Sequence, residues 1–179
     1  MLVEQVICSN EEIVVLGIDP GTVITGYGIV KASKKRVFLP ITYGIIRPKA
    51  SLSLSERYRI IFQDLEKLIE TYSPQALSIE TQFVDKNPQT AIKLGMARGV
   101  AVLAASLKNI PIFEYTPSRA KAAVTGSGKA DKQQVKMMVT RLLGLSQAPE
   151  GPEDITDALA LALCYAYSWT AGKTDYHCL

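Results

Sequence analysis

Residues 13–21, IVVLGIDPG, decide the fold class. The apolar run over 13–19 has the length of a buried strand, and the Asp-Pro-Gly that ends it is typical of a turn. Residues 25–32 then alternate as a second strand, and residues 36–47 continue as a third β segment. The chain therefore opens with an antiparallel β-meander.

Helices and short strands alternate after the meander. Residues 53–72 have apolar side chains at helical spacing, and Ser53 with Glu56 matches a capping box. Short strands are expected at 76–80 and 111–115. Further helices are expected at 88–108, from 116 to the Gly-Ser-Gly break at 126–128, at 130–143 and at 154–169. This order predicts an α/β fold whose five-stranded mixed sheet, an antiparallel meander plus parallel strands, is flanked by helices.

Length and composition set the class of protein. The 179 residues, 47% hydrophobic and 21% charged, fit a single domain over 1–179, with 1–12 as an N-terminal extension and 171–179 as a short tail. No apolar stretch approaches the ~18 residues of a membrane span. The first residues also lack the basic start of a signal peptide. We therefore expect a cytoplasmic protein with no membrane partner.

The cysteines and the histidine argue against several kinds of chemistry. Cys8, Cys164 and Cys178 form no CxxC pair, so the spacing favours neither a disulfide framework nor a zinc site. The single histidine, His177, lies in a segment expected to fray. Hydrolysis by a Ser–His or Cys–His pair is therefore not expected.

Four acids stand where elements are expected to begin or end. Asp19 closes the first strand, Glu80 closes the fourth, and Asp154 and Asp157 lie in the first turn of the last helix. Structural alternatives exist: Asp19 can start a turn, Asp154 can cap the helix, and Asp157 can oppose the helix dipole. Together the four predict a site for Mg²⁺ or Mn²⁺, which prefer carboxylates to His or Cys. Two such ions can activate water for phosphodiester hydrolysis.

Residues 119–141 concentrate positive charge. The whole chain has a net charge of only +3, whereas this segment has one acid, Asp131, and six basic residues: Arg119, Lys121, Lys129, Lys132, Lys136 and Arg141. Such a segment is either a solvated helix surface or a phosphate-binding patch. If it is a patch, Lys121 and Lys132 are candidates for stabilising negative charge beside the metal ions.

The helix expected at 88–108 is unusually rich in small residues. They are Gly95, Ala97, Gly99, Ala101, Ala104 and Ala105. A low surface of this kind serves close packing on a sheet or a contact between two copies of the chain, and the sequence leaves both interpretations open.

Taken in order, these features resemble the motifs of the RuvC family of Holliday-junction resolving endonucleases, in the RNase H-like superfamily. The resemblance covers roughly residues 14–167. It rests on GIDPG with TGYG, on IE with Phe83 and Asn87, on KLG with ARG, on VTG with Lys132, and on DITDALA. Ile155 and Thr156 replace the paired alanines usual in that family but leave the spacing of the carboxylates intact.

The resemblance implies a function for these residues. Asp19, Glu80, Asp154 and Asp157 would hold two Mg²⁺ ions per active site, with Mn²⁺ able to substitute, and Lys121 and Lys132 would act beside them. Phe83 would stack on a base of the DNA. Further DNA contacts are expected from Lys86, Asn87, Arg119, Lys129 and Lys136.

The resemblance also implies a substrate and partners. A homodimer would make paired symmetric nicks in four-way junction DNA, leaving 5′-phosphate and 3′-hydroxyl ends. RuvA and RuvB, the branch-migration complex, would be its partners.

Two other interpretations compete with this one. Residues 17–22 also resemble the phosphate-binding hairpin of actin-like ATPases and sugar kinases, but those proteins close two such domains over a nucleotide, and this chain has no second hairpin. A junction-binding protein without catalysis is disfavoured because carboxylates without a catalytic use would repel DNA.

Overall fold

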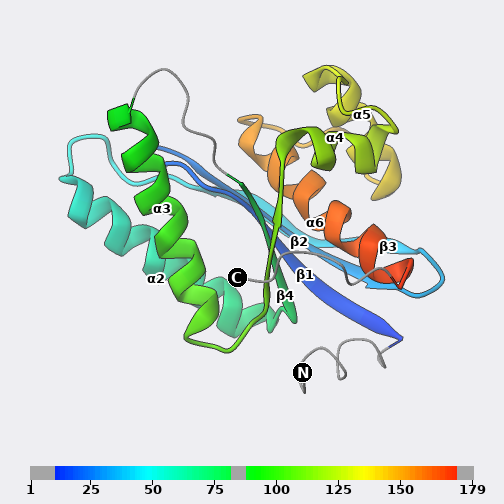
Figure 1. Cartoon of the computed structure of the whole chain (residues 1–179), viewed down its shortest axis with the longest axis horizontal. Helices are drawn as coiled ribbons and strands as arrows, with labels where there is room; N and C mark the ends of the chain where they lie inside the picture. Colours follow the sequence, from blue (N-terminus) through cyan, green and yellow to red (C-terminus); the bar gives the residue numbers. More distant parts are fainter. Residues whose placement is uncertain (1–10, 82–87, 173–179) are drawn as a thin grey trace.

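The computed structural model describes residues 11–81 and 88–172. Their strands form one mixed sheet in the order β3-β2-β1-β4-β5 (Figure 1). The meander β1–β2–β3 is antiparallel, and β4 and β5 continue the sheet in parallel with β1. The bounds are β1 Glu12–Asp19, β2 Thr25–Ser33, β3 Phe38–Ile46, β4 Ala76–Glu80 and β5 Ile112–Tyr115. The predicted five-stranded α/β architecture is confirmed.

Helices cover both faces of the sheet. The helices α2 and α3 lie on one face, and α4, α5 and α6 lie on the other (Figure 1). Their bounds are α2 Leu54–Tyr72, α3 Pro88–Ser106, α4 Pro117–Thr125, α5 Lys132–Leu142 and α6 Asp154–Thr170. None of the helices in the described part of the chain is both long and apolar enough to span a membrane.

Strand β1 separates two hydrophobic cores. Its side chains alternate between faces, so that Ile13 and Val15 pack with α6, whereas Leu16 and Ile18 pack with α2 and α3. Strands buried on both faces read as continuous apolar runs, which is why the opening stretch has no polar residue before Asp19.

The element boundaries agree with the sequence expectations to within a few residues. The capping box of Ser53 and Glu56 is present at the start of α2. β3 starts at Phe38, later than expected, because Arg36 adopts a left-handed conformation (φ 60°) in the preceding turn. Likewise α5 starts at Lys132 because Asp131 is its N-cap.

The small residues of α3 divide between its two sides. The alanines Ala97, Ala101, Ala104 and Ala105 are buried in the core shared with α2. Gly95 and Gly99 lie on the exposed side, where a Cβ atom would meet no other heavy atom within 4 Å. Packing on the core therefore accounts for the alanines and leaves the glycines unexplained.

Helix α6 lies directly against the backbone of β1 and β2. A Cβ atom on Gly17 would stand 2.1 Å from the carbonyl oxygen of Ala158, and one on Gly28 would stand 2.6 Å from Leu159 Cδ2. Gly17 and Gly28 are register partners, so they form one bare patch under the helix. Glycine is required here for close approach.

We expect Gly17→Ala to lower the free energy of unfolding by about 1–3 kcal/mol or more, because its methyl group would push α6 away from the sheet. Urea unfolding measures this change. Gln133→Ala is the control: it places an alanine on an exposed surface of α5, outside every contact discussed, and should leave the free energy of unfolding unchanged or slightly raised. A Gly17→Ala protein as stable as the unmodified one would contradict the close approach.

Candidate active site

Asp19 and Glu80 lie side by side at one edge of the sheet. The parallel strands β1 and β4 pair Ile18 with Ile79, and the two acids are the next residue in each strand. Both are only partly exposed. They stand at the carboxyl ends of parallel strands, where open α/β sheets bind their ligands.

The start of α6 brings two more acids to this edge. A Cβ atom on Gly26, the register partner of Asp19, would stand 2.0 Å from the carbonyl oxygen of Asp154. Asp154 and Asp157 are one turn apart in the first turn of α6. The N-cap is Glu153, and it makes no side-chain capping bond, so the interpretation of Asp154 as a helix cap is wrong.

Burial and mutual repulsion disfavour the ionised forms of these acids. Burial, followed by the charges of Glu80, Asp157 and Asp154, raises the pKa of Asp19 to about 8. Burial and then Asp157 raise the pKa of Glu80, and burial raises the pKa of Asp157. The carboxylates therefore form one electrostatic cluster, in which burial and mutual repulsion outweigh the positive charge nearby.

Two lysines lie beside the carboxylates. A pocket of about 180 Å³ is lined by Glu80, Asp157, Lys121 and Lys132 over an apolar floor that includes Ala120 and Val135. Lys121 and Lys132 both lower the pKa of Asp157, opposing the effect of burial. The pocket thus places cations and carboxylates around one solvent-accessible space.

Sequence reasoning missed Glu153. Its carboxylate forms an ion pair with the Nζ of Lys132, which joins the start of α5 to the start of α6. The hydrogen bond to Glu153 raises the pKa of Lys132, so the lysine stays charged. The only signal in the sequence was an acid next to Asp154, which by itself does not indicate a lysine partner.

The other predicted DNA-binding residues have different positions. Arg119 on α4 and Lys129 before α5 are exposed, and Lys136 on α5 is partly exposed; none of the three lines the pocket. Arg119 lies with its guanidinium carbon 5.7 Å from the centre of the Tyr115 ring. Phe83, Lys86 and Asn87 lie outside the described residues.

The donor chemistry of the cluster suits a hard cation. Its donors are carboxylate oxygens, the ligands of Mg²⁺ and Mn²⁺. Among residues 11–81 and 88–172, no three acids, histidines or cysteines stand close enough to form a ready-made metal cluster. A bound cation would offset the mutual repulsion of the carboxylates at this edge.

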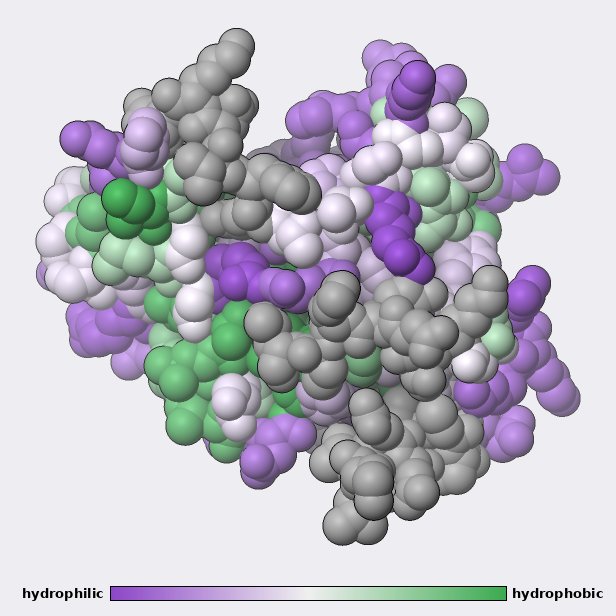
Figure 2. All heavy atoms as spheres, in the orientation of Figure 1, coloured by the Kyte–Doolittle hydropathy of each residue, from purple (hydrophilic) through white to green (hydrophobic). Residues whose placement is uncertain are grey.

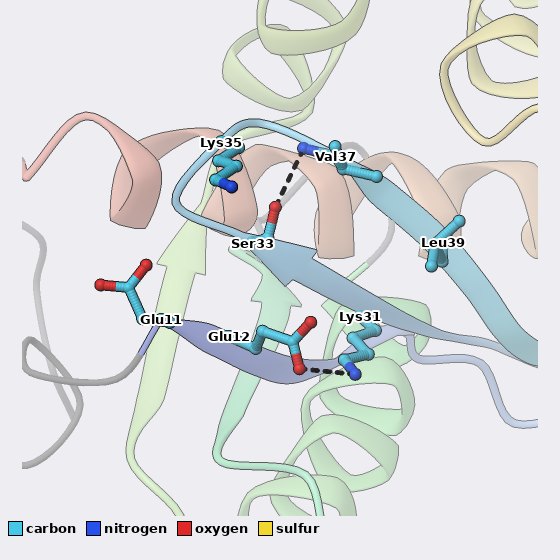
Figure 3. A pocket seen from close by; sticks show the side chains of 7 residues that line it. All are labelled: Glu11, Glu12, Lys31, Ser33, Lys35, Val37 and Leu39. Carbon is cyan, nitrogen blue, oxygen red and sulfur yellow. Dashed lines mark hydrogen bonds and ion pairs between the residues drawn. The ribbon is translucent and has the colours of Figure 1, made fainter.

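A larger pocket of about 390 Å³ lies at the opposite end of β1 from Asp19 (Figure 3). An ion pair of 2.6 Å joins Lys31 to Glu12 in it, and the Ser33 hydroxyl accepts a hydrogen bond from the amide of Val37. None of the predicted site residues lines this pocket. The carboxylate edge is therefore the candidate active site.

Comparison with known proteins gives consistent matches. Residues 15–165 match the family model of RuvC, crossover junction endodeoxyribonuclease. The chain is 52% identical to crossover junction endodeoxyribonuclease RuvC of Protochlamydia amoebophila, covering 93% of this chain and 98% of the relative. It is 47% identical to the protein of the same name from Chlamydia abortus, covering 92% and 98%.

Solved structures agree with these matches. The T. thermophilus RuvC structure in complex with Holliday junction substrate has a TM-score of 0.86 at 31% identity, covering 93% of this chain and 99% of that one. The yeast mitochondrial Holliday junction resolvase Ydc2, with a TM-score of 0.63 at 16% identity and coverage of 95% and 85%, shares the fold.

The raised pKa of Asp19 predicts a pH-dependent stability. Between pH 3.8, its ordinary pKa, and about 8, the folded protein retains a proton that the unfolded chain loses. In the presence of a chelator, we therefore expect the free energy of unfolding to fall as the pH rises through this window. Asp19→Asn should flatten this profile, and Mg²⁺ should stabilise the unmodified protein more at pH 8 than at pH 5. A flat profile for the unmodified protein would contradict the shifted pKa.

Proposed function

Because the chain belongs to the RuvC family of crossover junction endodeoxyribonucleases, we propose that it resolves Holliday junctions at the edge where Asp19, Glu80, Asp154 and Asp157 converge. It is a nuclease that hydrolyses phosphodiester bonds and depends on a metal. The observation that supports this site most directly is that the ends of β1 and β4 and the first turn of α6 bring these four acids to one edge of the sheet. Burial and the neighbouring acids raise the pKa of Asp19 to about 8, and a bound cation would offset that effect.

Mg²⁺ is the metal that this donor set fits best, with Mn²⁺ able to substitute. Asp19, Glu80, Asp154 and Asp157 would hold two ions per active site. When bound, these ions would activate a water molecule and stabilise the oxygen that leaves. Metal binding would favour the ionised form of Asp19, whose pKa burial raises to about 8, so metal affinity would depend on pH.

The lysines act on the phosphate. Lys121 and Lys132 line the same pocket as Glu80 and Asp157, so their ammonium groups can contact a scissile phosphate at the metal site. Preorganised cations of this kind stabilise the negative charge that develops in phosphoryl chemistry. The ion pair with Glu153 holds Lys132 over the pocket until the phosphate arrives.

Basic side chains around the pocket would track the DNA backbone. Arg119, Lys129 and Lys136 come from α4, the segment before α5, and α5 itself. We assign to them sequence-independent contacts with phosphates. We also assign DNA contacts to Phe83, Lys86 and Asn87, with Phe83 stacking on a base, from their match to the family motifs.

The exposed side of α3 supports a homodimer. It presents Ile92, Met96 and Leu103 to solvent next to Gly95 and Gly99. Figure 2 shows apolar residues gathered over this helix. An apolar helix surface with small residues lets a second copy of the helix approach closely, and two active sites then serve the paired nicks of one junction, which leave 5′-phosphate and 3′-hydroxyl ends.

Cooperation with RuvA and RuvB completes the proposal and rests on family membership. We assign the reaction to the cytoplasm, where such branch-migration partners act on DNA.

Asp19→Asn and Glu80→Gln should each slow Mg²⁺-dependent nicking of a synthetic four-way junction by more than about 100-fold. Loss of a residue that only orients a metal ligand typically slows a metalloenzyme by up to about 100-fold, so loss of a ligand itself should slow it more. Junction binding, measured with a chelator present, should persist. Asp131→Asn is the matched control, because asparagine also caps α5 and the acid lies outside the site. If Glu80→Gln cut the junction at the normal rate, the site assignment would be wrong. If the unmodified protein bound the junction without cutting it, a non-catalytic junction-binding protein would be favoured.

Leu103→Glu should raise the dissociation constant of the dimer about 30-fold or more, the effect of losing an interface hot spot worth ~2 kcal/mol. Analytical ultracentrifugation measures it. Leu39→Glu is the control, because Leu39 is equally exposed (54% against 52%) but lies on β3. Equal weakening by both substitutions, or by neither, would place the dimer contact elsewhere.

A further inference from the structure

Ser78 is a buried polar residue that links the sheet to α6. Its side chain is fully buried in β4, and its hydroxyl donates a 2.7 Å hydrogen bond to the carbonyl oxygen of Leu161. In the sheet register Ser78 is the partner of Gly17, which in turn pairs with Gly28. The three form a row of small residues under α6, and among them only Ser78 has a side-chain group able to bond to the helix.

Helix α6 runs in the opposite direction to β4. Gly26 and Gly28 of β2 meet Asp154 and Leu159 respectively, so residue numbers increase together along β2 and α6. Since β2 is antiparallel to β1, and β1 is parallel to β4, α6 is antiparallel to β4. Moving up β4 from Ser78 therefore means moving back along α6 from Leu161.

The hydrogen bond between Ser78 and Leu161 lies about equally far from Glu80 along β4 and from Asp157 along α6. Glu80 lies two residues beyond Ser78 on the same face of the strand, about 6.6 Å away along β4. Asp157 lies four residues before Leu161 on the same face of the helix, about 6 Å away along α6. The hydrogen bond of Ser78 thus sets a register in which Glu80 stands opposite Asp157.

This register needs support because the two carboxylates repel each other. Glu80 and Asp157 line the same pocket of about 180 Å³, so their carboxylates lie close enough to repel each other. Without a cation, this repulsion favours separation of the end of β4 from the start of α6. The hydrogen bond from Ser78 to Leu161 joins the same strand and helix close to the two carboxylates, so it resists that separation.

We propose that Ser78 is a positioning residue, whose hydrogen bond to Leu161 holds Glu80 and Asp157 at the separation that one metal ion can bridge. The proposal rests on the assignment of these two acids as metal ligands under the proposed function. It adds to that assignment a residue that contacts neither metal nor DNA.

The test is Mn²⁺ binding by the DNA-free protein, followed by electron paramagnetic resonance. Ser78→Ala should raise the Mn²⁺ dissociation constant about tenfold or more, as losses of outer-shell partners do. Nicking of saturating junction should slow at low Mg²⁺ and recover at high Mg²⁺, while junction affinity in chelator stays unchanged. An unchanged Mn²⁺ affinity in Ser78→Ala would overturn the proposal.

Ser168→Ala is the matched control for stability. The Ser168 hydroxyl also donates to a carbonyl of α6, that of Cys164 at 3.0 Å, but this bond lies within the helix and does not reach the sheet. We expect Ser168→Ala to bind Mn²⁺ as tightly as the unmodified protein, and the melting temperature of both variants is recorded beside the Mn²⁺ titrations. If Ser168→Ala weakened Mn²⁺ binding as much as Ser78→Ala, general loosening of α6 would explain both and the proposal would fail.

Glu80→Gln, titrated in parallel, separates this proposal from the function it rests on. Wild-type Mn²⁺ binding by Glu80→Gln would refute the assignment of Glu80 as a ligand. Lost binding in Glu80→Gln combined with normal binding in Ser78→Ala would leave the site intact and overturn only the role of Ser78.

Discussion

The structure depends on the close contact between α6 and the bare backbone of β1 and β2. Gly17 and Gly28 leave no side chain between helix and sheet, so α6 packs on main-chain atoms. Thirteen of the 17 residues of α6 are buried. The same close contact at Gly26 brings the start of α6 next to Asp19. It thereby places the two acids of α6 beside the acids that end β1 and β4.

This contact creates an electrostatic cost that the chain itself does not remove. Carboxylates from β1, β4 and α6 meet where water is partly excluded, and burial raises the pKa of Asp19, Glu80 and Asp157. Lys121 and Lys132 compensate only in part. A site that is short of positive charge next to a basic surface suits a nuclease, because divalent cations and a phosphate backbone complete its balance of charge.

The two faces of the sheet carry different functional surfaces. The face under α4, α5 and α6 holds the carboxylates, the lysines and the pocket. The face under α2 and α3 forms the second core and carries the exposed apolar side of α3. The candidate active site and the proposed dimer contact therefore lie on opposite faces of one sheet. In a dimer, the sheet of each copy would fix the distance between the two active sites.

Local patterns in the sequence determined most of the fold. Neighbouring residues suffice to predict the apolar strand that ends at Asp19, the capping box at Ser53 and the helical periodicities. The motifs around the four acids sufficed to indicate the family. Only the tertiary structure decided what meets across the sheet. The ion pair of Lys132 with Glu153 and the bond of Ser78 to Leu161 join residues 21 and 83 positions apart. Such contacts depend on how closely α6 approaches the strands, a distance set by packing that no local pattern encodes.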